Sequence, residues 1–247
     1  MLALDSQKIP HYALFADINP KTRKLPSGRL LVPEITVGEQ GSPKFEIVFD
    51  SERILHWLDE TRGTNFYPTD AAAPLSIRAS DKILGGAVLY YNWIHYESYA
   101  LSMRATVDRE FLPGFICFFR AEILDFALEP ERVKKRPHAQ AMIGADVDLN
   151  DEPAVRRILM DELTFFQSLL KMDSQEYLLE GTTEPTAVDF SVHVMVEKFV
   201  GTMGDANNLP SMPELLEEKS LVRLWRWNQS MVEKHPLRFK GKGKPKD

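Results

Sequence analysis

The hydrophobic pattern changes its period at Asp50, from that of a strand to that of a helix. Phe45, Ile47 and Phe49 alternate along the chain, as in a half-buried strand. Four apolar residues then recur at helical spacing, namely Ile54, Leu55, Trp57 and Leu58. Asp50 is a good N-cap residue for a helix that begins at Ser51. Because a helix N-terminus presents free N–H groups and positive dipole charge, the junction is either a plain capped helix or a site for a small anion such as a carboxylate.

The chain upstream of this unit predicts two further strands, over residues 9–18 and 30–37. Pro33 interrupts the second strand, and a proline inside a strand is typical of an edge, a bulge or a cis peptide bond. Residues 63–74 are rich in Thr, Pro and Ala, and we interpret them as the boundary between two domains.

Beyond this boundary the apolar residues recur mainly with the period of a helix. The stripes are formed by Ile83, Leu84, Ala87, Val88, Tyr91 and Ile94, by Phe111, Phe115, Phe118, Phe119 and Phe126, by Val155, Ile158, Leu159, Leu163, Phe166 and Leu170, by Val188, Val192, Val196 and Phe199, and by Leu221, Leu224, Trp225 and Trp227. Residues 129–150 have few large apolar side chains, so we expect them to form an exposed, mobile connection. The basic residues 237–247 are expected to form a disordered tail.

Composition is that of an ordinary globular protein with one or two domains. Of its 247 residues, 44% are hydrophobic and 27% are charged. The net charge of −6 argues against a nucleic-acid partner. No apolar run is long enough to cross a bilayer. The single cysteine, Cys117, excludes an intramolecular disulfide and fits a reducing, cytoplasmic location.

The spacing of histidines and glycines favours neither a metal site nor a nucleotide site. The six histidines have no ligand spacing; they are His11, His56, His95, His138, His193 and His235. No glycine loop is suited to hold phosphates, since Gly85 and Gly86 lie inside a predicted helix, where they would ease close packing.

A second motif lies between Leu178 and Phe190. Thr186 and Asp189 have the spacing of a capping box, in which the hydroxyl accepts the N–H three residues on and the carboxylate reaches back to the N-cap amide. The sequence Leu-Glu-Gly comes before this box, and an apolar helix follows it. This combination is more specific than the box alone.

Together these motifs resemble the glutathione transferase superfamily. Val32-Pro33 in a strand, followed by a short turn, a second strand and Asp50-Ser51 at the start of a helix, is similar to that family's second βββα half-motif. The capped helix and the final helix match its helical domain, and the resemblance covers about residues 9–236. It implies an α+β protein, with an incomplete thioredoxin-like domain over 1–62, a linker over 63–74, an all-helical domain over 75–236 and the tail 237–247. Members of the family are usually homodimers.

The resemblance also implies roles for particular residues. Val32, ahead of a cis-Pro33, would pair its backbone with the cysteinyl part of glutathione, and Asp50 and Ser51 would hold the γ-glutamyl end. Glutathione would be the co-substrate, and its thiolate would be conjugated to a small electrophile in a detoxification reaction. The helix with Tyr90, Tyr91, Trp93 and Tyr96 would lie beside the acceptor-substrate pocket, or would simply belong to the core.

One expected part of such an enzyme does not align with this chain. Family members activate the glutathione thiol with a Tyr, Ser or Cys in the first strand–helix turn. Aligned by its motifs, the chain starts after that turn, and Ser6 and Tyr12 do not match the position, so the catalytic residue stays unassigned. The family's first strand would then be missing from the sheet. Either strand 9–18 shifts to pair with strand 30–37, or another segment takes the place of the first strand, or the chain is a fragment.

Three functions therefore remain open on the sequence. The first is a glutathione transferase, or a truncated copy of one. The second is a non-catalytic interaction module that reuses the same fold. The third is an inactive paralogue without a ligand.

Overall fold

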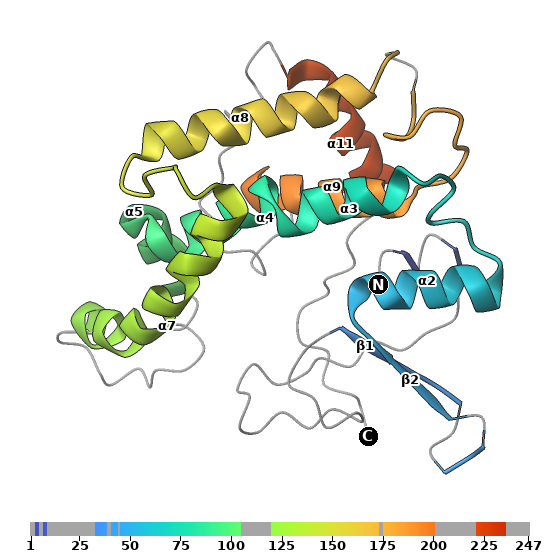
Figure 1. Ribbon diagram of the computed structural model, residues 1–247, viewed down its shortest axis with the longest axis horizontal. Helices are drawn as coiled ribbons and strands as arrows, with labels where there is room; N and C mark the ends of the chain where they lie inside the picture. Colours follow the sequence, from blue (N-terminus) through green and yellow to red (C-terminus); the bar gives the residue numbers. More distant parts are fainter. Residues whose placement is uncertain are drawn as a thin grey trace.

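The computed structural model describes residues 3–4, 7–8, 33–38, 41–43, 45–104, 120–172, 175–200 and 221–235. This part of the chain is mainly helical and includes one two-stranded antiparallel sheet (Figure 1). The elements in chain order are β1 (Glu34–Val37), β2 (Glu46–Phe49), α2 (Ser51–Arg62), α3 (Ala72–Asp81), α4 (Ile83–Leu89), η1 (Tyr90–Ile94), α5 (Tyr96–Tyr99), η2 (Ala100–Arg104), α7 (Arg120–Ile143), α8 (Glu152–Leu169), α9 (Ala187–Val200) and α11 (Val222–Lys234).

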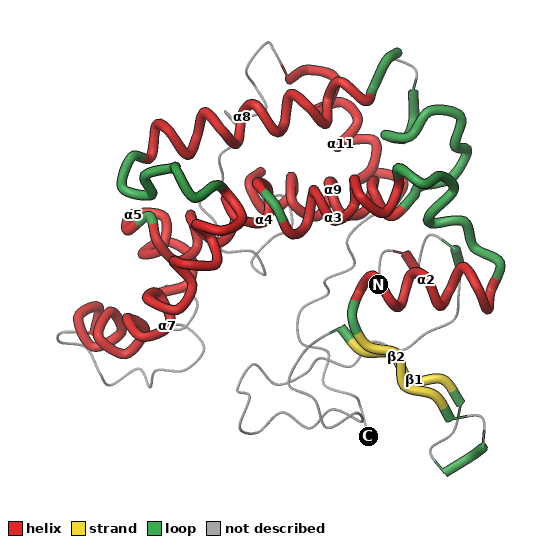
Figure 2. Tube along the Cα trace, viewed as in Figure 1, coloured by secondary structure: helices red, strands yellow, loops and turns green. Residues whose placement is uncertain are grey.

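The predicted strand–helix unit is confirmed. β1 and β2 pair antiparallel, with Glu34 opposite Phe49 and Val37 opposite Glu46. α2 follows β2 directly and packs beside the strand pair (Figure 2). The helix ends at Gly63, whose φ of 66° is the left-handed conformation that glycine adopts without a steric penalty.

The buried position of β2 is Val48, which lies between the alternating residues. Phe45, Ile47 and Phe49 are only partly buried, whereas Val48 is 9% exposed and belongs to the same core as Leu58. The sheet has two strands in the described part of the chain. The alternation predicted the strand correctly, but it did not identify the side chain that reaches the core.

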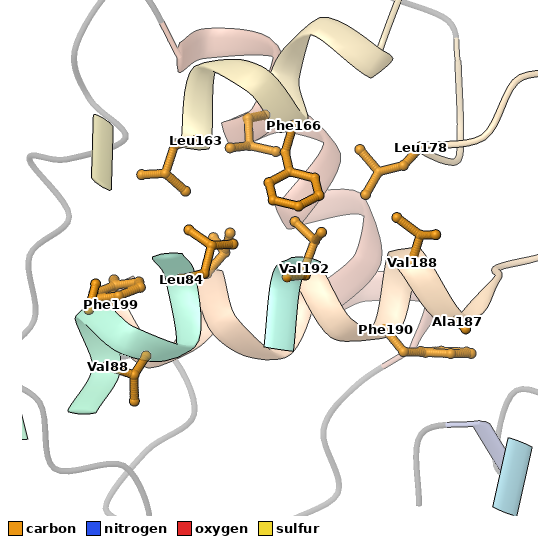
Figure 3. Close-up of a cluster of buried hydrophobic side chains, with 14 of the residues drawn as sticks. Leu84, Val88, Leu163, Phe166, Leu178, Ala187, Val188, Phe190, Val192 and Phe199 are labelled. Atoms are coloured by element: carbon orange, nitrogen blue, oxygen red, sulfur yellow. The ribbon is translucent and has the colours of Figure 1, made fainter. Parts of the chain in front are cut away.

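α9 lies at the centre of the helical part. α3 packs along it, and α4 and α11 also contact it. α8 packs against α4 and α11. Leu163 and Phe166 of α8 point toward Leu84 of α4 and Val192 of α9 (Figure 3). The predicted stripes of α8, α9 and α11 therefore form one continuous core.

The expectation that residues 129–150 form an exposed, mobile connection is wrong. Residues 129–143 are the second half of α7, and Ala139 and Ile143 are buried against α4. Few large side chains are needed because Gly86 of α4 allows a close approach. A Cβ atom built on Gly86 would lie 2.8 Å from Met142 Cβ. The predicted packing role of Gly85 and Gly86 is thus confirmed, and it explains why the α7 segment has so few large apolar residues.

Two other helical predictions need correction. The single helix expected through residue 94 is instead α4 followed by the wider π-helix η1, and both Tyr90 and Tyr91 are buried. Phe126, which was expected on an apolar stripe, is 85% exposed on α7. The other members of that stripe lie outside the described residues, as do strand 9–18 and the tail 237–247.

The segment between α2 and α3 is held at both of its ends. The Asp59 carboxylate of α2 accepts hydrogen bonds from the backbone N–H groups of Phe66 (2.9 Å) and Tyr67 (3.1 Å). The Phe66 ring is fully buried, and its carbonyl accepts the N–H of Ala187, the first residue of α9, at 3.0 Å. α3 begins at Ala72, three residues before the expected start of the helical region at 75. The proposed domain limits themselves stay a prediction.

Candidate functional site: the junction of β2 and α2

The structure brings two of the predicted binding residues together. The backbone N–H of Asp50 donates to the carbonyl of Pro33 at 3.1 Å, so the residue before β1 lies beside the residue after β2. Pro33, Asp50 and Ser51 are all exposed. Pro33 precedes β1 directly, and residues 30–32 of the predicted strand lie outside the described residues. Val32 lies outside the described residues.

Asp50 has an unusual backbone conformation. Its φ is 75° and its ψ is 132°, a region that residues with a Cβ rarely adopt. Its side chain is nevertheless a regular N-cap, because Asp50 Oδ1 accepts the backbone N–H of Glu52 at 3.0 Å. Strain of this kind costs on the order of 1–3 kcal/mol and tends to occur at functional sites.

The first turn of α2 presents unused backbone donors. The N–H of Glu52 is taken by Asp50, and that of Ile54 donates to the Asp50 carbonyl at 2.9 Å. The N–H groups of Ser51 and Arg53 have no acceptor within the described part of the chain. These two donors and the positive end of the helix dipole favour an anion at this position.

Charged groups of both signs surround these donors. The Arg53 guanidinium lies 5.3 Å from the centroid of the Phe49 ring, on the exposed side of the first turn. The carboxylates of Asp50 and Glu52 lie on the same turn. A ligand end with one positive and one negative group therefore fits this arrangement better than a simple anion does.

Tyr67 adds a hydroxyl group to this neighbourhood. Its ring stacks on His56 of α2 with a centroid distance of 4.1 Å. Burial raises the pKa of Tyr67, and the carboxylates of Glu52, Asp59 and Asp50 raise it further. The hydroxyl is therefore a neutral donor, and it has no hydrogen-bond partner among the described residues.

The sequence did not single out Arg53 or Tyr67. For Arg53 a weak signal existed, since a basic residue in the first helical turn opposes the usual preference for acidic residues there. For Tyr67 there was none, because its position beside α2 depends on the hydrogen bonds that the Asp59 carboxylate accepts from the following segment.

The predicted Thr186–Asp189 box is a buried folding device. The Asp189 carboxylate accepts the Thr186 N–H (2.8 Å), the Thr186 hydroxyl (2.7 Å) and the N–H of Leu178 (2.7 Å). The predicted bond from the N-cap amide to the carboxylate is confirmed, whereas the Thr186 hydroxyl, expected to accept the N–H of Asp189, instead donates to the Asp189 carboxylate. The bond to Leu178 also ties the preceding loop to α9. Asp189 is fully buried, so it contributes to stability and cannot contact a ligand.

A second buried polar group joins α9 to α11. Nδ1 of His193 lies 2.7 Å from Oδ1 of Asn228, and the Asn228 amide donates to Glu197 Oε1 at 2.5 Å. With the amide nitrogen directed at Glu197, His193 Nδ1 must donate its proton to Asn228. Burial lowers the pKa of His193 and raises the pKa of Glu197.

The aromatic residues proposed beside an acceptor pocket divide into two groups. Tyr90 and Tyr91 are core residues, and the Tyr91 hydroxyl donates to Glu152 at 2.8 Å. Tyr96 is 53% exposed and donates to Asp125 at 2.9 Å. Tyr90 and Tyr91 therefore belong to the core interpretation.

Within the described residues, no group of three His, Cys, Asp or Glu side chains is placed to bind a metal ion. No helix of the described part is long and apolar enough to span a bilayer. Comparison with protein families, curated proteins and solved structures finds no match to this chain.

Proposed function

We propose that this protein binds glutathione at the junction of β2 and α2, in the manner of a glutathione transferase. The γ-glutamyl end of glutathione carries an α-carboxylate and an α-ammonium group. The free N–H groups of Ser51 and Arg53 and the Ser51 hydroxyl suit the carboxylate, and the Asp50 carboxylate suits the ammonium group. Val32 and Pro33 would accompany the cysteinyl part.

The observation that carries this proposal is the strained conformation of Asp50. A plain helix cap needs no positive φ, and a strained residue persists only where the surrounding structure enforces it. At Asp50 the strain coincides with free backbone donors and with an adjacent Pro33 carbonyl. This combination supports a binding role more than a capping role alone.

The test is retention on immobilised glutathione. A resin that carries glutathione through its sulfur leaves the γ-glutamyl end free and should retain the protein. A resin that carries glutathione through its amino group should not retain it. Ser51→Ala should weaken retention, whereas Ser168→Ala, at an exposed serine of α8 whose hydroxyl donates to Phe165 at 2.6 Å, should leave it unchanged.

A second variant separates binding from stability. Asp50→Gly removes the carboxylate but relieves the positive φ, and glycine caps a helix nearly as well as aspartate. We expect the free energy of unfolding to stay the same or to rise by about 1 kcal/mol, while retention is lost. A variant that unfolds less readily and still binds glutathione would refute the proposal.

Conjugation of glutathione to a generic electrophile should be very slow. No residue of this chain has been matched to the family's thiol-activating position, so the thiol would keep a pKa near that of a free cysteine. Rapid turnover by the purified chain would show that another residue stabilises the thiolate.

A further inference from the structure

A pocket with a volume of about 180 Å³ lies between α11 and the segment that follows α8. Leu170 and Trp227, both almost fully buried, supply its apolar lining. Arg226, Ser230 and Lys234 of α11 supply polar lining. α11 and α2 lie on opposite sides of α3 and α9 in Figure 1, so this pocket is separate from the β2–α2 junction.

The two walls of the pocket are locked together by reciprocal capping. Oε1 of Gln167, on α8, accepts the N–H groups of Arg223 (3.1 Å) and Leu224 (3.2 Å) at the start of α11. In return, Nη1 of Arg223 donates to the carbonyl of Leu170 at 2.7 Å, just beyond the end of α8. Each helix thus satisfies backbone groups at the terminus of the other.

Gln175 stiffens the loop wall in the same way. Its Nε2 donates to the carbonyls of Leu169 (3.1 Å) and Tyr177 (2.7 Å), and its Oε1 accepts the N–H of Lys171 at 3.0 Å. One side chain therefore fixes three points of the loop. The pocket is consequently pre-formed, which lowers the entropy cost of binding.

Cations outnumber anions among the described residues that line the pocket, although the whole chain has a net charge of −6. Arg223, Arg226 and Lys234 contribute three cations, and Glu176 contributes one anion, which pairs with Lys234 at 3.0 Å. Arg226 is exposed and has neither an ion pair nor a hydrogen bond in the described part of the chain. Ser230 follows it by one helical turn, on the same face of α11.

We propose that this pocket binds a small organic anion with a body of about one ring. Arg226 and Ser230 would bind the carboxylate or phosphate group, and Trp227 would face the ring. A cavity of about 150 Å³ accommodates a benzene ring, whereas drug-sized ligands need at least about 300 Å³. The volume therefore selects a compound the size of benzoate or phenyl phosphate.

Calorimetric titration of the full chain with phenyl phosphate and benzoate tests this proposal, and the better binder identifies the preferred anionic group. Benzamide, which is neutral and similar in shape to benzoate, should bind at least tenfold more weakly than benzoate. Arg226→Gln should weaken binding of the anions about tenfold, because it removes the unpaired cation while keeping a polar side chain. Ser230→Ala should weaken it by a smaller factor.

Arg157→Gln is the matched control, since Arg157 is an exposed arginine on α8 that does not line the pocket. It should bind both anions like the wild type. Equal binding by Arg226→Gln and the wild type, or benzamide binding as tight as benzoate binding, would overturn the proposal. The outcome is independent of the glutathione site, because Asp50→Gly should leave phenyl phosphate binding unchanged and Arg226→Gln should leave glutathione retention unchanged.

Discussion

Replacing Asp189 with alanine should strongly destabilise the protein. The Asp189 side chain is the single acceptor for the Leu178 N–H, the Thr186 N–H and the Thr186 hydroxyl. All three residues are at most 1% exposed, so water cannot replace the missing oxygens. Burial raises the pKa of the Asp189 carboxyl, although the three donors oppose that shift.

The expected loss follows from the two backbone groups that Asp189→Ala leaves without an acceptor. Each buried N–H without a partner costs roughly 1–3 kcal/mol, which gives roughly 2–6 kcal/mol for the pair. Removing a buried carboxylate also abolishes its desolvation cost, which offsets part of this loss. We therefore expect the free energy of unfolding to fall by about 3 kcal/mol.

Asp151→Ala is the matched control. Asp151 caps α8 by accepting the Ala154 N–H at 3.2 Å, but it is exposed, so water can take its place. Its replacement should cost about 1 kcal/mol, as for an ordinary N-cap. Urea unfolding followed by circular dichroism at 222 nm measures both losses. If Asp189→Ala costs no more than Asp151→Ala, the reasoning about buried donors is wrong.

Two other predictions concern the helical core. Because burial lowers the pKa of His193 below its ordinary 6.5, the unfolded chain binds more protons below that pH, and stability falls as pH decreases from 6.5. The raised pKa of Glu197 acts in the opposite sense, so the effect of His193 is measured as the difference in unfolding free energy between wild type and His193→Gln. This difference should shrink by about 1 kcal/mol between pH 7 and pH 5.5. A constant difference would contradict the assignment. Gly86→Ala should cost about 1–3 kcal/mol in thermal or urea unfolding, because the new methyl group would lie 2.8 Å from Met142 Cβ and 2.9 Å from Ile143 Cγ1. A neutral effect would mean that α7 can move away from α4 freely.

The sequence predicted those elements that are determined by residues close together along the chain. The alternation ahead of Asp50 predicted β2, and the helical period after it predicted α2. The carboxylate arm of the Thr186–Asp189 box was also predictable, because a capping box depends on residues only three apart. None of these needed knowledge of what packs against them.

Predictions failed where the structure of a segment is determined by the distant part of the chain that packs against it. The second half of α7 is helical because Gly86 lets Ala139 and Ile143 reach the core, and that information lies more than 50 residues earlier in the chain. Likewise, Tyr67 is brought to α2 by its N–H bond to Asp59 and by the bond between the Phe66 carbonyl and Ala187, both of which depend on residues distant in sequence. The anion pocket depends on the reciprocal capping of α8 and α11, which no single stretch of sequence reveals.

The stability of the β2–α2 junction is physically linked to the capping of α9. A two-stranded sheet is marginal by itself, so the junction needs support from α2 and from what holds α2 in place. Asp59 of α2 binds the Phe66 N–H, and the Phe66 carbonyl binds the N–H of Ala187, two residues before Asp189. A chain of hydrogen bonds, part-buried at Asp59, thus runs from the first turn of α9 to the C-terminal half of α2. Because the Asp50 strain needs a rigid surrounding, the α9 cap helps to maintain that strain at the other end of the chain of bonds.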